Sequence, residues 1–477
     1  MRRRFWRRGG RASFFADVLS LQGGLVAVSL AVMLVVGWQF KRSPGSRNLE
    51  LLLLFASGLF FFDAMRFFGV LRRPEYLRLL DWVYIAVVAI GLMLMARAVY
   101  RVMQPAPARW MPNLQVPVLG VLAIALLCTN LWILFARTSD DAGFFVNLGA
   151  QRLRERGRLP YGDPMLTGTP GAAYGPLLYA AHVPLQVLLA PDGVNRSSPD
   201  RLDPAAGPYY LPPPRATQLA VALFHVMGIA ALFIGVRRIA DSSTALAIVC
   251  LYASSLAVLG IGGPDDQVAG LTFVSHIAPA AMTLAAFAAL HKPSLSGVLL
   301  VLSAGVGFYP AFMGPAWLGY YWNDHARRRS FVVAVALTAI ILSAGVYALS
   351  SPAAGRSRLG TIIYDTFGHH TDPAGYGASP FGFWGQRGGI RRALTTPLVG
   401  DSGLTSPAWL LFASFMSATF FLARGRRPAE LALLAGAVAM GATLIKPHAT
   451  GTYLAWFYPL LLVGFLAGGF TSSEQKV

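Results

Sequence analysis

Residues 115–141 read QVPVLGVLAIALLCTNLWILFARTSDD, an apolar run that ends in a polar turn with two carboxylates. A helix needs about 20 mostly apolar residues to cross the hydrocarbon core of a bilayer, and residues 115–136 supply them. Charge at the edge of the hydrocarbon is costly, so Asp140 and Asp141 at this position indicate that the charge is used. The stretch predicts a membrane helix with a functional loop at its end.

Similar runs recur along the 477 residues, of which 55% are hydrophobic and only 13% are charged. This composition is too apolar for an ordinary soluble domain. Two stretches are less regular: 174–190 is short, and Pro310 and Pro315 break 295–322 into two shorter helices. The sequence predicts an all-α polytopic membrane protein, a bundle of about 11 to 14 segments with outer loops and amphipathic juxtamembrane helices. Besides 115–136, the regular segments are 17–40, 48–71, 81–102, 215–236, 243–262, 273–291, 330–350, 406–423, 428–445 and 452–470.

The formal charge of +19 does not indicate a nucleic-acid partner, because the basic residues form short clusters at segment ends and no basic face with interleaved aromatics. The lipid bilayer and anionic lipid-linked substrates are the expected partners. Cys128 and Cys250 both fall inside apolar segments and are interpreted as small core residues. The basic start, Met1–Arg8, precedes an apolar run too long for a cleaved signal, so it predicts a retained helix.

Clusters of Lys and Arg mark cytoplasmic helix ends. They are Arg237-Arg238, Lys292, Arg327-Arg328-Arg329, Arg424 and Arg426-Arg427. With 295–322 counted as two crossings, four polar stretches fall on the opposite side: 191–214, 262–275, 351–406 and 446–453. The loop with Asp140 and Asp141 joins them if 174–190 only dips into the outer leaflet, which we favour because Pro176 and Pro184 make a poor spanning helix. Four full crossings before this loop would place the N-terminus outside, against the positive-inside tendency, so either one of the first three segments does not span or the N-terminal hundred residues break the rule.

Two units are expected along the chain. Residues 1–110 are interpreted as an additional N-terminal helical module that ends in the connector Gln104–Pro107. Residues 111–477 form the main unit, with outer loops 137–214, 262–275 and 351–406. We expect this unit to lie in the plasma (inner) membrane as a multi-pass protein, with its functional loops on the outer side.

The first outer loop offers carboxylates beside cations. From Ala142 it can form an amphipathic helix with Arg154 and Arg158 near its end, stopped by Pro160-Tyr161-Gly162. A carboxylate can take the proton from an attacking hydroxyl while cations hold a leaving phosphate, which is the arrangement that a transferase with a membrane phosphate ester needs. The alternative is that Asp140 and Asp141 only cap the helix.

Other outer loops add candidates. Asp265-Asp266-Gln267 could share a divalent cation with the first pair, divide the roles of base and acceptor binder with it, or only solvate a turn. The aromatic, Gly-rich block Ser379–Gln386, which includes Trp384, suits sugar stacking. His369 and His370 with Asp372 lack a spaced set of partners, so no metal site is predicted there. Near the last helix, Lys446, His448 and Tyr453 suit phosphate contact or an interfacial anchor.

In their order along the chain, these motifs resemble the GT-C superfamily of multi-pass glycosyltransferases, and within it the mannosyltransferase-like proteins of glycosyltransferase family 87. The resemblance covers roughly residues 115–470. The matching elements are Asp141 at the end of a helix, Gly157-Arg158-Leu159-Pro160-Tyr161-Gly162, Tyr174-Gly175-Pro176-Leu177, Asp265-Asp266-Gln267, Ser379-Pro380-Phe381 through Trp384-Gly385, and Lys446-Pro447-His448.

The resemblance implies an enzyme that transfers mannose or another hexose or pentose from a polyprenyl-phosphate carrier to a glycan or lipid acceptor, with inversion. Asp141 would be the catalytic base, with Asp140 as the nearest substitute. Gly305–Pro310 lacks the Lys or Arg that the family often has there, so Arg154, Arg158 or Lys446 would meet the donor phosphate. No cofactor is assigned, and a divalent cation stays open. The implied substrate-binding residues are Asp265, Asp266, Gln267, Arg154, Arg158, Tyr161, Tyr174, His370, Ser379, Trp384, Lys446 and His448.

Two other functions stay open. A transporter or flippase of a lipid-linked or small anionic solute would need polar residues inside several helices, of which Asp63 and Arg66 are the main examples. An inactive GT-C-like scaffold would fit the missing cation near Phe308.

Overall fold

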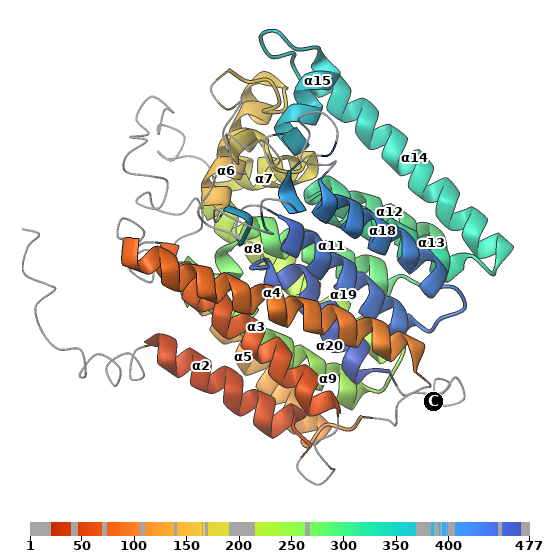
Figure 1. Cartoon of the computed structure of the whole chain (residues 1–477). Helices are drawn as coiled ribbons and strands as arrows, with labels where there is room; N and C mark the ends of the chain where they lie inside the picture. Colours follow the sequence, from red (N-terminus) through yellow and green to blue (C-terminus); the bar gives the residue numbers. More distant parts are fainter. Residues whose placement is uncertain are drawn as a thin grey trace, which may run out of the picture.

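The chain folds into a bundle of helices in a computed structural model (Figure 1). The only strands among the described residues are β1 (Ile261–Gly262) and β2 (Val268–Ala269), which pair antiparallel. The all-α prediction is therefore confirmed, apart from this short ladder. The structure describes residues 21–39, 46–68, 74–104, 110–137, 141–164, 166, 170–189, 215–262, 268–368, 383–385, 391, 394–396, 398, 406–446 and 451–468.

In the described ranges, six helices or helix pairs are long and apolar enough to cross a membrane. The segments are Leu80–Met103 within α4 (Pro74–Met103), α5 (Val116–Ala136), α8 (Arg215–Arg237), Ser242–Leu259 over α9 (Ser242–Ala253) and α10 (Leu256–Leu259), α14 (His325–Leu349) and α19 (Pro428–Ile445). The remaining longer helices are α2 (Leu21–Val32) with the π-helix η1 (Met33–Gly37), α3 (Ser46–Phe68), α6 (Asp141–Arg156), α7 (Pro176–Leu189), α11 (Val274–Ala288), α12 (Pro293–Val306), α13 (Gly314–Tyr321), α18 (Pro407–Leu422) and α20 (Leu454–Leu466).

Exposed apolar surface supports a bilayer as the surroundings of the bundle. On α14, Leu337, Ile340 and Ile341 are 57, 65 and 72% exposed, and only Phe331 is buried. Such a helix would expose a large apolar patch to water, whereas in hydrocarbon it is well solvated. The chain thus has the arrangement of a multi-pass membrane protein.

Side chains at the helix starts explain where several helices begin. Asp241 accepts a hydrogen bond from the Thr244 backbone N–H at 2.7 Å and caps α9, and Asp324 caps α14 in the same way through Arg327 at 3.0 Å. Pro428 occupies the first turn of α19, where no intrahelical donor is required. Polar caps therefore mark the points where apolar runs begin.

The stretch 295–322 folds back on itself, as predicted. After α12, a 3₁₀ turn (η8, Tyr309–Met313) that contains Pro310 leads into α13, which has Pro315 in its first turn. The indole Nε1 of Trp317, in the middle of α13, donates to Ser296 Oγ at 3.1 Å, so α13 runs back alongside the start of α12. The interpretation as two short helices is confirmed.

The predicted basic clusters gather at one end of the bundle, here called the basic end. Arg238 donates to the carbonyl of Ala288, and Arg327 donates to the carbonyl of Leu290 at 3.1 Å. The guanidinium of Arg424 lies 5.1 Å from the ring centroid of Trp322, which follows α13. These contacts join the ends of α8, α11, α13, α14 and α18.

The opposite end, here called the loop end, brings together residues 157–175 and 349–368. The Leu159 N–H donates to the Leu349 carbonyl at 2.8 Å, and the Ser351 N–H donates to the Tyr161 carbonyl at 3.1 Å. Helix α7 stays at this end, because its residue Leu185 packs with Ala216 at the start of α8. This position agrees with the expectation for 174–190, whereas its failure to cross the membrane stays a prediction.

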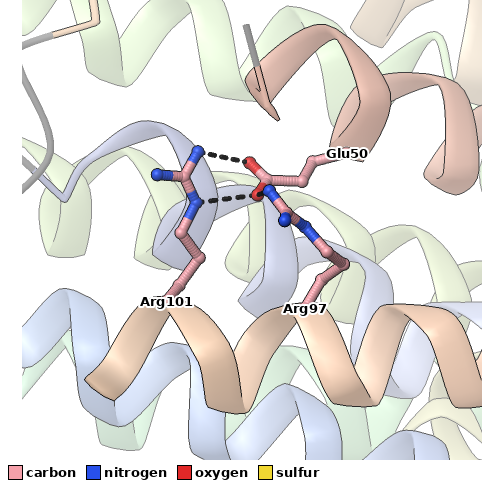
Figure 2. A network of polar contacts seen from close by, with 3 residues as sticks. All are labelled: Glu50, Arg97 and Arg101. Carbon is pink, nitrogen blue, oxygen red and sulfur yellow. Dashed lines mark hydrogen bonds and ion pairs between the residues drawn. The ribbon is translucent and has the colours of Figure 1, made fainter. Parts of the chain in front are cut away.

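The N-terminal helices pack directly on the later ones (Figure 1). Helix α4 lies along α19, and α3 contacts α4 and α20. Near the start of α2, Leu25 clusters with Ile133, Leu259 and Ala269 at the loop end. At the basic end, Glu50 of α3 is bonded by Arg97 and Arg101 of α4 (Figure 2). The division into residues 1–110 and 111–477 stays a prediction.

Candidate functional site

Helix α6, the predicted amphipathic helix, begins at Asp141 and lies at the loop end. Its buried side includes Val146 and Ala150. Polar contacts hold its backbone from two other helices: Thr217 Oγ1 donates to the Gly143 carbonyl at 2.9 Å, and Gln186 Nε2 donates to the Asn147 carbonyl at 2.6 Å. The start of this helix is thereby fixed relative to α7 and α8.

The basic residues of α6 and the following turn face different surroundings. Arg154 lies 3.4 Å from the Glu155 carboxylate, in an ion pair on the helix surface. Arg158 is exposed and donates to the Ser350 carbonyl at 3.4 Å. Arg158 thus places a cation at the loop end beside the residues that follow α14.

Tyr161 and Tyr174 are brought together, as part of one hydrogen-bonded unit. The Tyr161 hydroxyl donates to the Tyr174 carbonyl at 2.6 Å, and the Tyr179 hydroxyl donates to the Gly171 carbonyl at 2.6 Å. Burial raises the pKa of Tyr161 well above its usual value, so the phenol stays a donor. The two tyrosine hydroxyls therefore hold the backbone of residues 171–174 in place.

Asp365 is the buried carboxylate that the sequence did not single out. It lies in the π-helical turn η9 (Tyr364–Gly368), which follows α15 (Arg358–Ile363), and is 1% exposed. Its Oδ2 accepts from the Gly162 N–H at 2.9 Å, whereas Oδ1 has no hydrogen-bond partner among the described residues. Burial raises the pKa of Asp365, and the Gly162 N–H and the nearby Arg356 oppose this shift.

Lys446, at the end of α19, lies against an aromatic cluster. Its Nζ is 3.8 Å from the ring centroid of Tyr453 and bonds the Tyr453 hydroxyl. The His276 ring lies 4.3 Å from that of Tyr453, and Trp456 stacks on Tyr309 at 3.9 Å. The ring face attracts the ammonium and holds it at this position.

Trp384 is anchored near Lys446. Its indole Nε1 donates to the Leu444 carbonyl at 2.6 Å. The neighbouring Phe383 lies under the Arg391 guanidinium at 4.2 Å, and Arg391 pairs with Asp81 of α4 at 2.5 Å. Helices α4 and α19 therefore hold this part of residues 351–406.

Aromatic contacts connect the surroundings of Asp365 and Lys446 through the break after α12. Phe308 contacts Phe367 of η9, with ring centroids 5.1 Å apart. The next residue, Tyr309, stacks on Trp456 beside Lys446. The turn η9 and the start of α20 thus meet at Phe308 and Tyr309.

Several predicted site residues lie outside the described residues, as does the side chain of Asp141. No three His, Cys, Asp or Glu side chains in the described ranges are grouped to hold a metal ion. The predicted residues outside the described ranges are Asp140, Asp265, Asp266, Gln267, His370, Ser379 and His448.

No protein-family model matches this chain. A search of curated proteins also finds no match. The sequence motifs and the geometry of the loop end are therefore the basis for a functional interpretation.

Proposed function

We propose that this chain is an integral membrane glycosyltransferase of the GT-C type, which moves a sugar from a polyprenyl-phosphate carrier to a glycan or lipid acceptor. The observation that supports it most is the convergence of distant loop-end segments around residues 305–309, with Lys446 and Asp365 joined through Phe308 and Tyr309. A transferase needs this type of convergence, because base, cation and sugar-binding groups must meet one substrate.

The proposed roles follow the positions of the residues. Asp141, at the first position of α6, takes the proton from the acceptor hydroxyl. Arg158 and Lys446 stabilise the departing phosphate, and Trp384 covers the sugar. The acceptor oxygen attacks the anomeric carbon opposite the phosphate, so the C–O bond to phosphate breaks as the new glycosidic bond forms, with inversion. The loop end then faces the outside of the plasma membrane.

Asp141→Asn tests this function. Membranes that contain the protein are given a radiolabelled polyprenyl-phosphate hexose, and label that moves to glycan or lipid is measured. Loss of a general base lowers the rate by roughly 10²- to 10⁴-fold, and we expect a loss of this size. The control is Asp163→Asn, which changes an acid seven residues from the end of α6 that pairs with Arg156 at 3.5 Å. Full transfer by Asp141→Asn, or no transfer by the wild type, would contradict the proposal.

A transporter is the second candidate, favoured by a polar pair inside the bundle. Asn130 of α5 and His225 of α8 are buried, and Asn130 Nδ2 lies 3.1 Å from His225 Nε2. Asn130 Oδ1 and His225 Nδ1 have no partner in the described part of the chain. Buried polar groups in membrane helices often mark a solute path. If the chain is a transporter, Asp141→Asn should leave its transport activity in the same membranes unchanged.

A further inference from the structure

The position of Asp365 suggests a role beyond solvation of a loop. Its side chain is buried at the point where the turn after α6 meets the turn after α15, although Gly162 and Asp365 are 203 residues apart in the chain. Buried polar atoms are nearly always bonded, so it is unusual that one oxygen of this carboxylate has no hydrogen-bond partner among the residues that the structure describes. The π-helical turn that carries it is a rare type that is frequently found at functional sites.

The partner of Asp365 lies in a turn that is tightly packed. Gly162 has φ +79°, and a Cβ atom there would lie 2.1 Å from the Ser351 carbonyl oxygen. The Ser351 N–H bonds the Tyr161 carbonyl on the other side of the same contact. The turn and residues 349–351 therefore pack directly against each other, and the Asp365 carboxylate accepts a hydrogen bond from the same turn.

The same unit reaches the start of α7 and the break after α12. The Tyr161 hydroxyl bonds the Tyr174 carbonyl, and Gly175 is packed against the Gly305 and Val306 carbonyls, where a Cβ would lie 2.3 and 2.4 Å from the two oxygens. Phe367, two residues after Asp365, contacts Phe308. One carboxylate thus lies where α6, α7, α15 and the break after α12 come together.

We propose that Asp365 is a positioning residue, whose hydrogen bond to the Gly162 N–H clamps the turn after α6 to the third outer loop and so fixes α6 over the site. This role rests on the proposed function, because α6 begins with the proposed base, Asp141. Arg158 lies within the clamped turn, so the clamp also sets the place of a proposed phosphate-binding cation. The charge of the carboxylate is not required, only its acceptor oxygen.

Three substitutions distinguish the role of the hydrogen-bond-accepting oxygen of Asp365 from the role of its negative charge. Asp365→Asn keeps an oxygen that can accept from the Gly162 N–H, whereas Asp365→Ala removes it. Asp365→Ser has a shorter reach and serves as a second disrupting variant if the alanine protein is not recovered monodisperse. The control is Asp163→Asn on the same turn, which pairs with Arg152 at 3.3 Å and Arg156 at 3.5 Å.

The first readout is independent of catalysis. The full-length protein in lipid nanodiscs is treated with trypsin, and cleavage after Arg156 or Arg158 is timed, since both residues are exposed, at the end of α6 and in the turn that follows. We expect the alanine or serine variant to be cleaved several-fold faster than wild type and the asparagine variant at the wild-type rate. Wild-type cleavage of the disrupting variants would overturn the clamp, whether or not the chain transfers sugar.

The second readout is steady-state transfer from the polyprenyl-phosphate hexose. A misplacement of about 1 Å can lower the rate by about 10²-fold, so Asp365→Ala should lower kcat by that order, with a smaller change in KM for the donor. Asp365→Asn should restore most of kcat. If Asp365→Asn loses kcat as fully as alanine while its cleavage stays at the wild-type rate, the carboxylate acts directly on the substrate and the positioning role is wrong.

Discussion

The two ends of the bundle each contain a buried carboxylate, and the two are bonded in opposite ways. At the basic end, Glu50 has a fully buried side chain and accepts from Arg97 Nη2 at 2.9 Å and from Arg101 Nε at 2.8 Å, while its second oxygen accepts from Arg101 Nη2 at 3.2 Å (Figure 2). At the loop end, one oxygen of Asp365 accepts a single hydrogen bond, from the backbone N–H of Gly162. The difference lies in how completely each charge is compensated.

The comparison separates two uses of buried charge. Complete pairing of Glu50 holds α3 to α4, two consecutive helices, and costs the protein a large desolvation that the two guanidinium groups offset. The incomplete hydrogen bonding of the buried Asp365 carboxylate lowers the stability of the protein at a junction of loops. Proteins tolerate such a loss mainly where the local geometry serves a function. We therefore expect substitutions of Glu50 to act on folding and substitutions of Asp365 to act on turnover.

The largest effect on stability is expected for Glu50→Ala. Removal of this carboxylate leaves Arg97 and Arg101, whose side chains are 24 and 14% exposed, without their shared counterion. Breaking a buried pair from one side costs about 3–5 kcal/mol. Denaturant unfolding in detergent micelles measures the loss. The control Glu155→Gln removes a surface pair with Arg154 and should cost less than about 1 kcal/mol. Equal stability of the two variants would break the comparison.

A smaller loss is expected for Gly162→Ala, at the other end of the molecule. The left-handed backbone at φ +79° and the close Ser351 carbonyl both disfavour a Cβ atom, and such strain costs about 1–3 kcal/mol. Gly157→Ala is the matched control, because its φ is +61° but nothing lies within 4 Å of the added atom. Unfolding measurements on both variants isolate the clash. A loss no greater than that of Gly157→Ala would mean that the turn is loosely packed.

Much of the fold was predictable because its signals are local. Pro310 and Pro315 fall within an apolar stretch and predicted the reversal between α12 and α13, where η8 lies. Pro184 helped to predict that α7 does not cross, although that helix keeps Pro184 in its interior. Apolar length alone located the six long spans. Each of these inferences needs only neighbouring residues.

The bonded partners at the two ends were not predictable in the same way. Asp365 stood in a recognised loop, but only the folded chain brings it to Gly162, and no spacing rule connects residues so far apart. Lys446 was selected from the sequence, whereas the His276 and Trp456 rings around it come from other helices. Glu50 was overlooked at the start of an apolar run, in favour of Asp63 and Arg66, whose side chains lie outside the described residues. Long-range pairing thus decided which charges are buried.

The smallest expected effect is the change with pH in the contribution of Asp365 to stability, and it tests the comparison between the two ends. Because burial raises the pKa of Asp365, the folded state binds its proton more tightly than the unfolded state, whose carboxyl has a pKa of about 3.9. Its contribution to stability is therefore fully present below the unfolded-state pKa and is lost as pH rises through the folded-state pKa. The groups whose charges act with this carboxyl are Tyr161, Tyr179 and Arg356, and neither phenol ionises in this range.

The Tm of wild type minus that of Asp365→Asn should fall as pH rises from 4 and then level off, with Glu155→Gln as the reference for general effects of pH. A difference that rises with pH would mean that the folded state holds the Asp365 carboxylate in its charged form, and the contrast between the two ends would disappear.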